Sequence, residues 1–208
     1  MTSPPSAPRQ PVVTYQHGIP EAHRTEAAAL YDQAFGAKLG VGIPDRDRRV
    51  TLLAETMRLD YGIGAIANGR LLGLAGFQTE TGSLTSGITV RTLRQRLGLA
   101  GALRAMAVFA LYDRPVNPGE LCMDGLVVHD DARGRGIGTR LLQAVVDLAG
   151  ERGDRSVRLD VIDTNTGARR LYDRFGFEAV GEERTGPLSG LLGFRSATRM
   201  EFTVEAPR

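Results

Sequence analysis

A glycine-rich segment carries the clearest chemistry in this sequence. It follows the apolar run Leu126-Val127-Val128 and a short polar turn, and it reads Arg133-Gly134-Arg135-Gly136-Ile137-Gly138-Thr139. We expect it to begin a helix, whose first N–H groups have no partner inside the helix and carry partial positive charge. Glycine lets an anion approach the backbone closely, and arginine adds charge-assisted donors. The segment therefore predicts a phosphate or pyrophosphate site.

Two common nucleotide motifs do not describe this segment. No Gly-Lys-Ser/Thr follows it, which excludes a Walker loop, and the dinucleotide fingerprint needs a glycine at position 139, where the chain has Thr139. A nucleotide-binding protein therefore stays only as a distant alternative.

A second pattern lies downstream, in Asn165-x-x-Ala168-x-x-x-Tyr172-x-x-x-Gly176-Phe177. Together with Arg133-x-x-Gly136-x-Gly138 it resembles the acyl-CoA signature of the GNAT N-acetyltransferases. The resemblance covers residues 121–183 with specific motifs, and residues 12–80 only through a compatible order of elements.

The resemblance implies an α/β fold with a mixed, mostly antiparallel sheet flanked by helices. A central strand pair would be splayed between the strand ending at Val128 and the strand ending at Ile162. Acetyl-CoA would be the co-substrate, with its pantetheine arm in that gap and its pyrophosphate on residues 133–139. The residues implied to bind it are Leu126, Val127, Val128, Arg133, Gly134, Arg135, Gly136, Gly138, Thr139, Asn165 and Tyr172.

Tyr172 has a further implied role, which is to protonate the departing thiolate. Its position on the apolar stripe of a helix also fits an ordinary core residue. Asn165 would cap that helix whether or not it contacts the cofactor.

The base that removes the proton from the attacking ammonium is less defined. Glu120 and Asp124 have the same parity on the strand before the glycine segment, so both can face one side. We favour Asp124, which is inside the strand, although either carboxylate could instead serve only the structure.

Cys122 shares this parity, but a lone strand cysteine is more often a small buried hydrophobe than a nucleophile. As the only cysteine it excludes an internal disulfide and a cysteine-based metal site. The histidines show no ligand spacing, so we expect no metal.

These features together predict transfer of an acetyl or other short acyl group from acetyl-CoA to a primary amine by direct attack. The acceptor could be a small molecule or a peptide. The alternative is a non-catalytic domain that binds acyl-CoA and regulates another process, because the same cradle serves both.

Alternating elements must position these residues. We expect strands near 12–16, 61–67, 70–79, 121–128, 157–161, 177–183 and 198–204, and helices near 21–35, 45–59, 136–149 and 165–175. The dipeptide Asn68-Gly69 predicts a type I′ hairpin turn, and Asp45 predicts a helix cap.

Residues 91–113 form an additional predicted helix, an insertion relative to the minimal family plan. Its expected buried face holds Leu93, Leu97, Ala100, Leu103, Ala107 and Leu111. It could cover the sheet, which we favour, pair two subunits, or wall an acceptor pocket. The loop 186–195 mixes glycine with apolar residues and is the better candidate to touch the acceptor.

The bulk composition fits this reading. The 208 residues suit one domain over 12–208 after a flexible Pro/Ser-rich tail at 1–11. A net charge of +2 and the absence of a basic-aromatic run argue against a nucleic-acid partner. We find no signal peptide and no membrane-spanning segment, and we expect a cytoplasmic protein that could form a homodimer.

Overall fold

The computed structural model describes residues 12–110, 115–186 and 189–204. The predicted tail at 1–11 and the last residues of the predicted 91–113 helix lie outside these ranges. The strands are β1 Thr14–His17, β2 Gly62–Ala67, β3 Arg70–Thr79, β4 Gly82–Ser83, β5 Glu120–Val128, β6 Ser156–Ile162, β7 Glu178–Arg184 and β8 Ser196–Thr203. The α-helices are α1 Arg24–Gly40, α2 Arg46–Thr56, α3 Val90–Ala110, α4 Ile137–Arg152, α5 Thr166–Phe175 and α6 Ser189–Leu192.

The strands form one mixed sheet in the order β1-β2-β3-β5-β6-β8-β7, with β4 paired to β3. Every pair is antiparallel except β5 with β6, which run parallel. That parallel pair is joined only from Glu120 to Cys122 and from Ser156 to Arg158. Beyond those residues the two strands separate, so the predicted fold class and its splayed central pair are confirmed.

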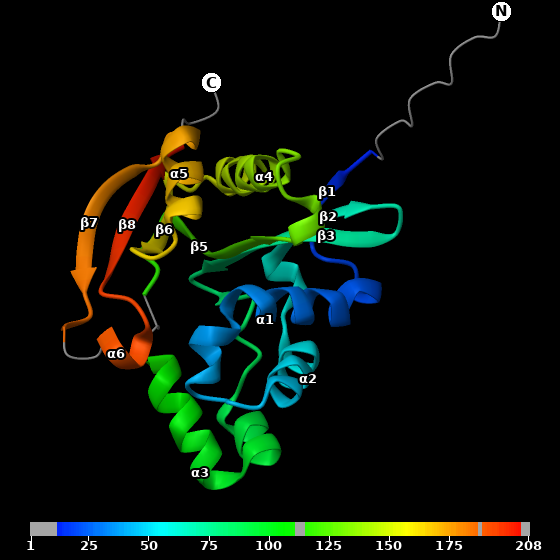
Figure 1. Ribbon diagram of the computed structural model, residues 1–208. Helices are drawn as coiled ribbons and strands as arrows, with labels where there is room; N and C mark the ends of the chain where they lie inside the picture. The colour runs from blue at the N-terminus through cyan, green and yellow to red at the C-terminus, as the bar shows by residue number, and fades with distance from the viewer. Residues whose placement is uncertain (1–11, 111–114, 187–188, 205–208) are drawn as a thin grey trace, which may run out of the picture.

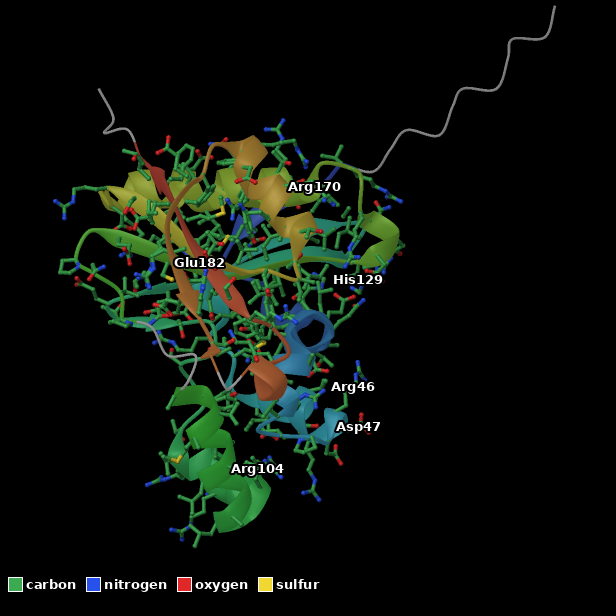
Figure 2. All side chains as sticks on the ribbon, turned by 60° about the vertical axis from the view of Figure 1, so that its left-hand side comes forward. Arg46, Asp47, Arg104, His129, Arg170 and Glu182 are labelled. Carbon is green, nitrogen blue, oxygen red and sulfur yellow. The ribbon has the colours of Figure 1, made fainter. Side chains whose placement is uncertain are left out.

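Two layers of helices enclose the sheet (Figure 1). α4 and α5 lie above it in that view, and α1 and α2 lie below β3 and β5. Figure 2 agrees, since Arg170 of α5 lies above the sheet while Arg46 and Asp47 at the start of α2 lie below it. Leu121 and Met123 of β5 join the core beneath α4, whereas Val127 joins the core beneath α1.

Local sequence signals set the ends of several elements. Asn68 and Gly69 have φ angles of 51° and 70°, as the hairpin between β2 and β3 requires. The Asp45 carboxylate accepts a hydrogen bond from the Arg48 N–H at 2.9 Å and caps α2, and Asn165 accepts from the Ala168 N–H at 3.1 Å and caps α5. These predictions are confirmed.

The first predicted helix extends further than the sequence suggested. α1 continues through Gly36 to Gly40 because Gly36 is an interior packing position. A Cβ there would lie 3.0 Å from Asp32 Oδ1, which pairs with Arg49 Nε of α2 at 2.7 Å. The missing side chain leaves room for this buried ion pair between the two helices.

The predicted buried face of the 91–113 helix is confirmed for Leu93 and Leu97 and is wrong for Ala100, Leu103 and Ala107, which are exposed. Gly98 has φ 70° and ψ −179°, so α3 is two helical pieces joined by a kink. The kink turns the second piece, which buries Ala102, Ala105 and Val108 and leaves Leu103 59% exposed.

The preferred role of this helix, covering the sheet, is also wrong. α3 packs on α2 and on the segment before it. Its buried residues form a separate cluster with Ile43 of that segment and Leu52 of α2. Arg104 Nε donates to the Gly42 carbonyl at 2.9 Å. Figures 1 and 2 show α3 below α2, away from the sheet.

Candidate active site

The gap between β5 and β6 is the centre of the candidate site. Both strands pass their last paired residues, Cys122 and Arg158, and then diverge. On its other side β5 has a bulge against β3, because Met123 lies opposite Phe77 and Gly125 lies opposite Gly76. Asp124 is the extra residue of this bulge. Bulges re-aim side chains and are frequent beside active sites.

The backbone of β5 beyond the bulge presents hydrogen-bonding groups to the gap. The His129 N–H donates to the Leu72 carbonyl of β3 at 2.9 Å. Successive residues of a strand point their N–H and C=O groups to opposite sides, so Val127 also faces β3. The N–H groups of Leu126 and Val128 therefore point toward the gap.

The glycine segment continues from β5 into α4 as predicted. Gly134 and Gly136 both have φ 75°, which side chains disfavour, and α4 begins directly after Gly136. A Cβ on either glycine would meet nothing within 4 Å, so the space above the backbone is open. The first turn of α4 contains no acidic residue, and Thr139 is exposed there. An anion can therefore reach the free N–H groups at the helix start.

Gly138 has a different function from the two preceding glycines. A Cβ at this position would lie 3.3 Å from Leu171 of α5 and 3.7 Å from Leu126 of β5. Its small size allows the start of α4 to pack closely on α5, so Gly138 positions the cradle.

Arg133 and Arg135 are exposed but held by the turn before α4. Arg133 Nε donates to the Val128 carbonyl at 3.3 Å, and its guanidinium pairs with Asp130 Oδ1 at 2.8 Å. Arg135 donates to the Asp131 carbonyl at 3.0 Å. Both cations thus stay beside the open glycines, where a phosphate would need them.

Tyr172 lies on α5 and is 7% exposed, with its ring 5.9 Å from that of Phe177. It belongs to the same core as Met123 and Val161, which come from the two strands that border the gap. Burial raises the pKa of Tyr172 to about 12, so its phenol is protonated at neutral pH. It can donate a proton or a hydrogen bond, but it is a weaker acid than an exposed tyrosine.

Asp124 lies on the opposite face of the sheet, toward α1. Its Oδ2 is inaccessible to solvent and has no hydrogen-bond partner. Burial raises the pKa of Asp124, while the charge of Lys38 on α1 acts to lower it. A carboxylate with a raised pKa is a stronger base, and the unpartnered oxygen is able to accept a proton from a ligand.

Glu120 lies at the closed end of the same strand pair. It is 8% exposed, and its carboxylate contacts Arg158 Nε at 3.3 Å and the side-chain amide of Asn117 at 3.3 Å. Arg158 is itself 3% exposed. The structure thus separates the two candidate bases, since Glu120 lies where β5 and β6 are paired, whereas Asp124 lies beyond the last paired residue of β5 with its Oδ2 buried.

Cys122 lies between these carboxylates and is buried. Burial raises the pKa of its thiol, although Arg158, whose guanidinium is 3.6 Å from Sγ, acts to lower it. A thiol with a raised pKa forms little thiolate, which agrees with the prediction of a small buried hydrophobe.

Three residues of α1 border the site and were missed from sequence. Phe35 lies against Gly125, where any Cβ would collide with its ring. Tyr31 is buried, and its pKa is raised well above the usual value by burial and by the charge of Asp124. Lys38 also acts on Asp124. No local signal could identify them, because α1 is separated from β5 by about half the chain.

The loop predicted to touch the acceptor contains α6 and borders two shallow hollows of about 480 and 520 Å³. Both are lined by Asp163, Ser189 and Arg195, and neither is lined by Asp124 or Tyr172. The hollows are thus separate from the chemical groups at the gap, and acceptor contact by this loop stays a prediction.

Metal and membrane features are also informative within the described ranges. There, no group of three or more His, Cys, Asp and Glu side chains could hold a metal ion. In the same part of the chain no helix combines the length and the apolar character needed to cross a bilayer.

Comparison with known proteins adds an independent line of evidence. The model of the acetyltransferase (GNAT) family matches residues 27–177. Spermine/spermidine N(1)-acetyltransferase of Bacillus subtilis is 31% identical over 86 residues, which are 39% of this chain and 57% of that protein. The chain thus spans little more than half the length of this curated relative.

Two solved structures share the fold. The GCN5-related N-acetyltransferase of Kribbella flavida superposes with a TM-score of 0.59 at 18% identity, covering 92% of this chain and 97% of that one. A putative acetyltransferase of Salmonella typhimurium, solved with its cofactor acetyl-CoA, gives a TM-score of 0.57 at 16% identity, covering 93% and 94%.

Proposed function

The chain belongs to the GNAT acetyltransferase family, and from that premise we propose that it transfers an acetyl group from acetyl-CoA to a primary amine by direct attack at the β5–β6 gap. The observation that carries the proposal is the unpartnered Oδ2 of Asp124, placed where the two strands separate.

The residues around the gap fit acetyl-CoA. The open glycines 134 and 136 and the start of α4 would hold the pyrophosphate, with Arg133 and Arg135 beside it. The backbone of Leu126 and Val128 would pair with the pantetheine amides, because these groups point into the gap. Asn165 caps α5, the helix that carries Tyr172.

The roles of the chain's groups follow from their charges. Asp124 accepts the proton that the attacking ammonium must lose, and the amine nitrogen then bonds to the acetyl carbon. The N–H group of Leu126 would donate to the oxygen that gains negative charge, which leaves the Leu126 carbonyl and the Val128 N–H for the pantetheine amides. As the carbon–sulfur bond breaks, Tyr172 donates its proton to the sulfur. The nitrogen loses its second proton as it becomes an amide, and that proton restores the phenol of Tyr172, while Asp124 releases the first proton to solvent.

Asp124 is a better base than Glu120 on this geometry. Glu120 already contacts buried Arg158 and the side-chain amide of Asn117, and it lies where β5 and β6 are paired, so its carboxylate is engaged within the fold. Tyr172 remains protonated across the working pH range because burial raises its pKa to about 12. Its hydroxyl is therefore available as a donor in every turnover.

The alternative is a non-catalytic acyl-CoA-binding domain, which needs the cradle but not the base. The buried Oδ2 of Asp124 favours catalysis, because a buried polar atom without a hydrogen-bond partner is costly to keep in a structure. The polyamine named for the Bacillus subtilis relative is not transferred here, since that match covers only 39% of this chain.

The test is release of coenzyme A thiol from acetyl-CoA in the presence and absence of a panel of primary amines. We expect at least one amine to accelerate thiol release, and mass spectrometry to find its acetylated form. Tight acetyl-CoA binding with no amine-dependent release would support the non-catalytic alternative.

A further inference from the structure

The residue between the proposed base and the proposed oxyanion donor is a glycine. Asp124 is the extra residue of the β5 bulge, Gly125 follows it, and the N–H group of Leu126 points into the gap. Both Asp124 and the bare side of Gly125 face α1. A thioester carbon that is attacked by an amine at Asp124, and whose oxygen is bound by Leu126, therefore lies beside Gly125.

The Phe35 ring of α1 fills the space that a side chain at position 125 would occupy. A Cβ on Gly125 would be nearest to Cζ of Phe35 and would lie 2.7 Å and 3.2 Å from its two Cε atoms. These three atoms form the outer end of the ring. The ring thus points end-on at the strand, and only a glycine at position 125 admits it.

Phe35 is packed from behind by its own helix and by the core. Its ring centroid is 4.5 Å from that of Tyr31, which is one turn earlier on α1 and buried. Phe35 also packs on the cluster that contains Val127 of β5. The buried pair of Asp32 with Arg49 connects α1 to α2. Side chains packed in this way resist displacement, so the ring is a wall of the gap.

The alkyl part of the acyl group is the part of the thioester that meets this wall. The three substituents of the thioester carbon lie in one plane and point away from one another. Tyr172, the proposed proton donor to sulfur, is on α5, which lies above the sheet, whereas α1 lies below it (Figure 1). With the sulfur toward α5 and the oxygen toward Leu126, the alkyl part is directed to α1. The amine attacks from outside this plane and therefore does not compete for the same space.

We propose that Phe35 sets the length of the acyl group, so that acetyl fits between its ring and Gly125 and longer chains are excluded. This inference rests on the proposed acetyl transfer, which places the thioester beside Gly125. A ring already in contact with the strand must be displaced by a longer chain, and overpacking of this kind is unfavourable. Phe35 is then a specificity-determining residue that takes no part in proton transfer.

The test compares acetyl-CoA, propionyl-CoA and butyryl-CoA on the full chain. Isothermal titration gives the Kd of each thioester without any amine, and thiol release with an active amine gives kcat/KM. Both are measured for the wild type, Phe35→Leu, Phe35→Ala and Leu39→Ala. Leu39 is the control, because it is one turn further along α1 and packs on the same cluster, whereas the atoms nearest to Gly125 belong to Phe35.

We expect the wild type to prefer acetyl-CoA to butyryl-CoA by roughly 10-fold or more in both Kd and kcat/KM, since one misfitting methylene in an apolar pocket is worth about 10–200-fold. Phe35→Leu should narrow this ratio. Phe35→Ala should bring the thioesters close to equality, because the space of the ring becomes available to the longer chain. Leu39→Ala should keep the ratio of the wild type.

Several results would overturn the inference. Equal use of the three thioesters by the wild type would do so while leaving acetyl transfer intact. A ratio that Phe35→Ala leaves unchanged, or that Leu39→Ala changes as much, would also contradict it. If Phe35→Ala changed the ranking of small and large amines but not that of the thioesters, the ring would bound the acceptor instead.

Failure of the proposed transfer gives a different result. Thiol release that no amine accelerates, with any thioester or variant, would overturn the transfer itself. The Kd ratios need no amine and still decide whether Phe35 limits the acyl chain. Because each ratio is taken on one variant, a general loss of folded protein affects every thioester alike and leaves the ratio intact.

Discussion

Replacing Asp124 by asparagine should separate its catalytic role from a structural one, because the two roles predict opposite changes in stability. Asparagine keeps the shape of the Asp124 side chain and removes its negative charge. A buried charge costs more than a buried neutral amide, although the amide leaves its polar atom equally unpaired, and burial raises the pKa of Asp124 because its charged form bears this cost. Lys38 offsets part of that cost through its charge. We therefore expect Asp124→Asn to raise the free energy of unfolding by about 1 kcal/mol at pH 7, which is ~2–4 °C in Tm for a domain of this size.

The pH dependence of this gain follows from the raised pKa of Asp124. Below the pKa of the unfolded chain, near 3.9, the carboxyl is protonated in both states and charge costs nothing. As the pH rises through the higher folded pKa, the buried charge develops and destabilises the wild type. The stability advantage of Asp124→Asn should thus be full at neutral pH and shrink toward pH 4.

Activity should change in the opposite direction. Loss of a general base lowers kcat/KM by roughly 10²–10⁴-fold at neutral pH. The deficit should shrink as the pH approaches about 10, where a lysine-like amine loses its proton unaided. Thermal melts and pH–rate profiles of the parent and the variant provide both readings. A variant that is less stable than the parent and equally impaired at every pH would refute the assignment of Asp124 as base.

Three further outcomes are expected. Acetyl-CoA at about 100 times its Kd should stabilise the fold by about 2.7 kcal/mol and raise its Tm. Gly136→Val should abolish this Tm shift. Gly153→Val is the control and should retain the shift, because Gly153 has nearly the same φ angle but lies at the other end of α4. Tyr172→Phe should lower kcat by about 10²–10⁴-fold with little change in the Kd of acetyl-CoA, and an unchanged kcat with chemistry rate-limiting would make Tyr172 a core residue. Glu120→Gln should lower Tm, because it weakens the buried contact with Arg158, and it should reduce activity by the same factor at all pH values. A change in the shape of its pH–rate profile would instead identify Glu120 as the base.

Much of the fold could be read from the sequence because its signals are local. Asn68-Gly69 requires positive φ angles whatever surrounds it, and Asp45 and Asn165 cap helices with their own side chains. The amphipathic pattern of α4 likewise predicted its buried residues Ile137, Leu141, Val145 and Leu148. In α3 the same reasoning failed, since one glycine at φ 70° changed the phase of the pattern.

The sequence by itself determined the glycine segment 133–139 that we propose as the phosphate cradle. The glycines, the arginines and the helix start are consecutive in the chain, so their arrangement depends on backbone angles that the residues themselves favour. Tertiary structure alone decided what surrounds each candidate base. Glu120 and Asp124 have the same parity, but Arg158 and Asn117 contact the first, whereas the second is the extra residue of a bulge beyond the paired part of β5 and β6, and its Oδ2 has no hydrogen-bond partner. The contacts of Arg199 on β8 with Asp160 on β6 and Glu183 on β7 are decided in the same way, because these residues meet only when the strands become neighbours in the sheet.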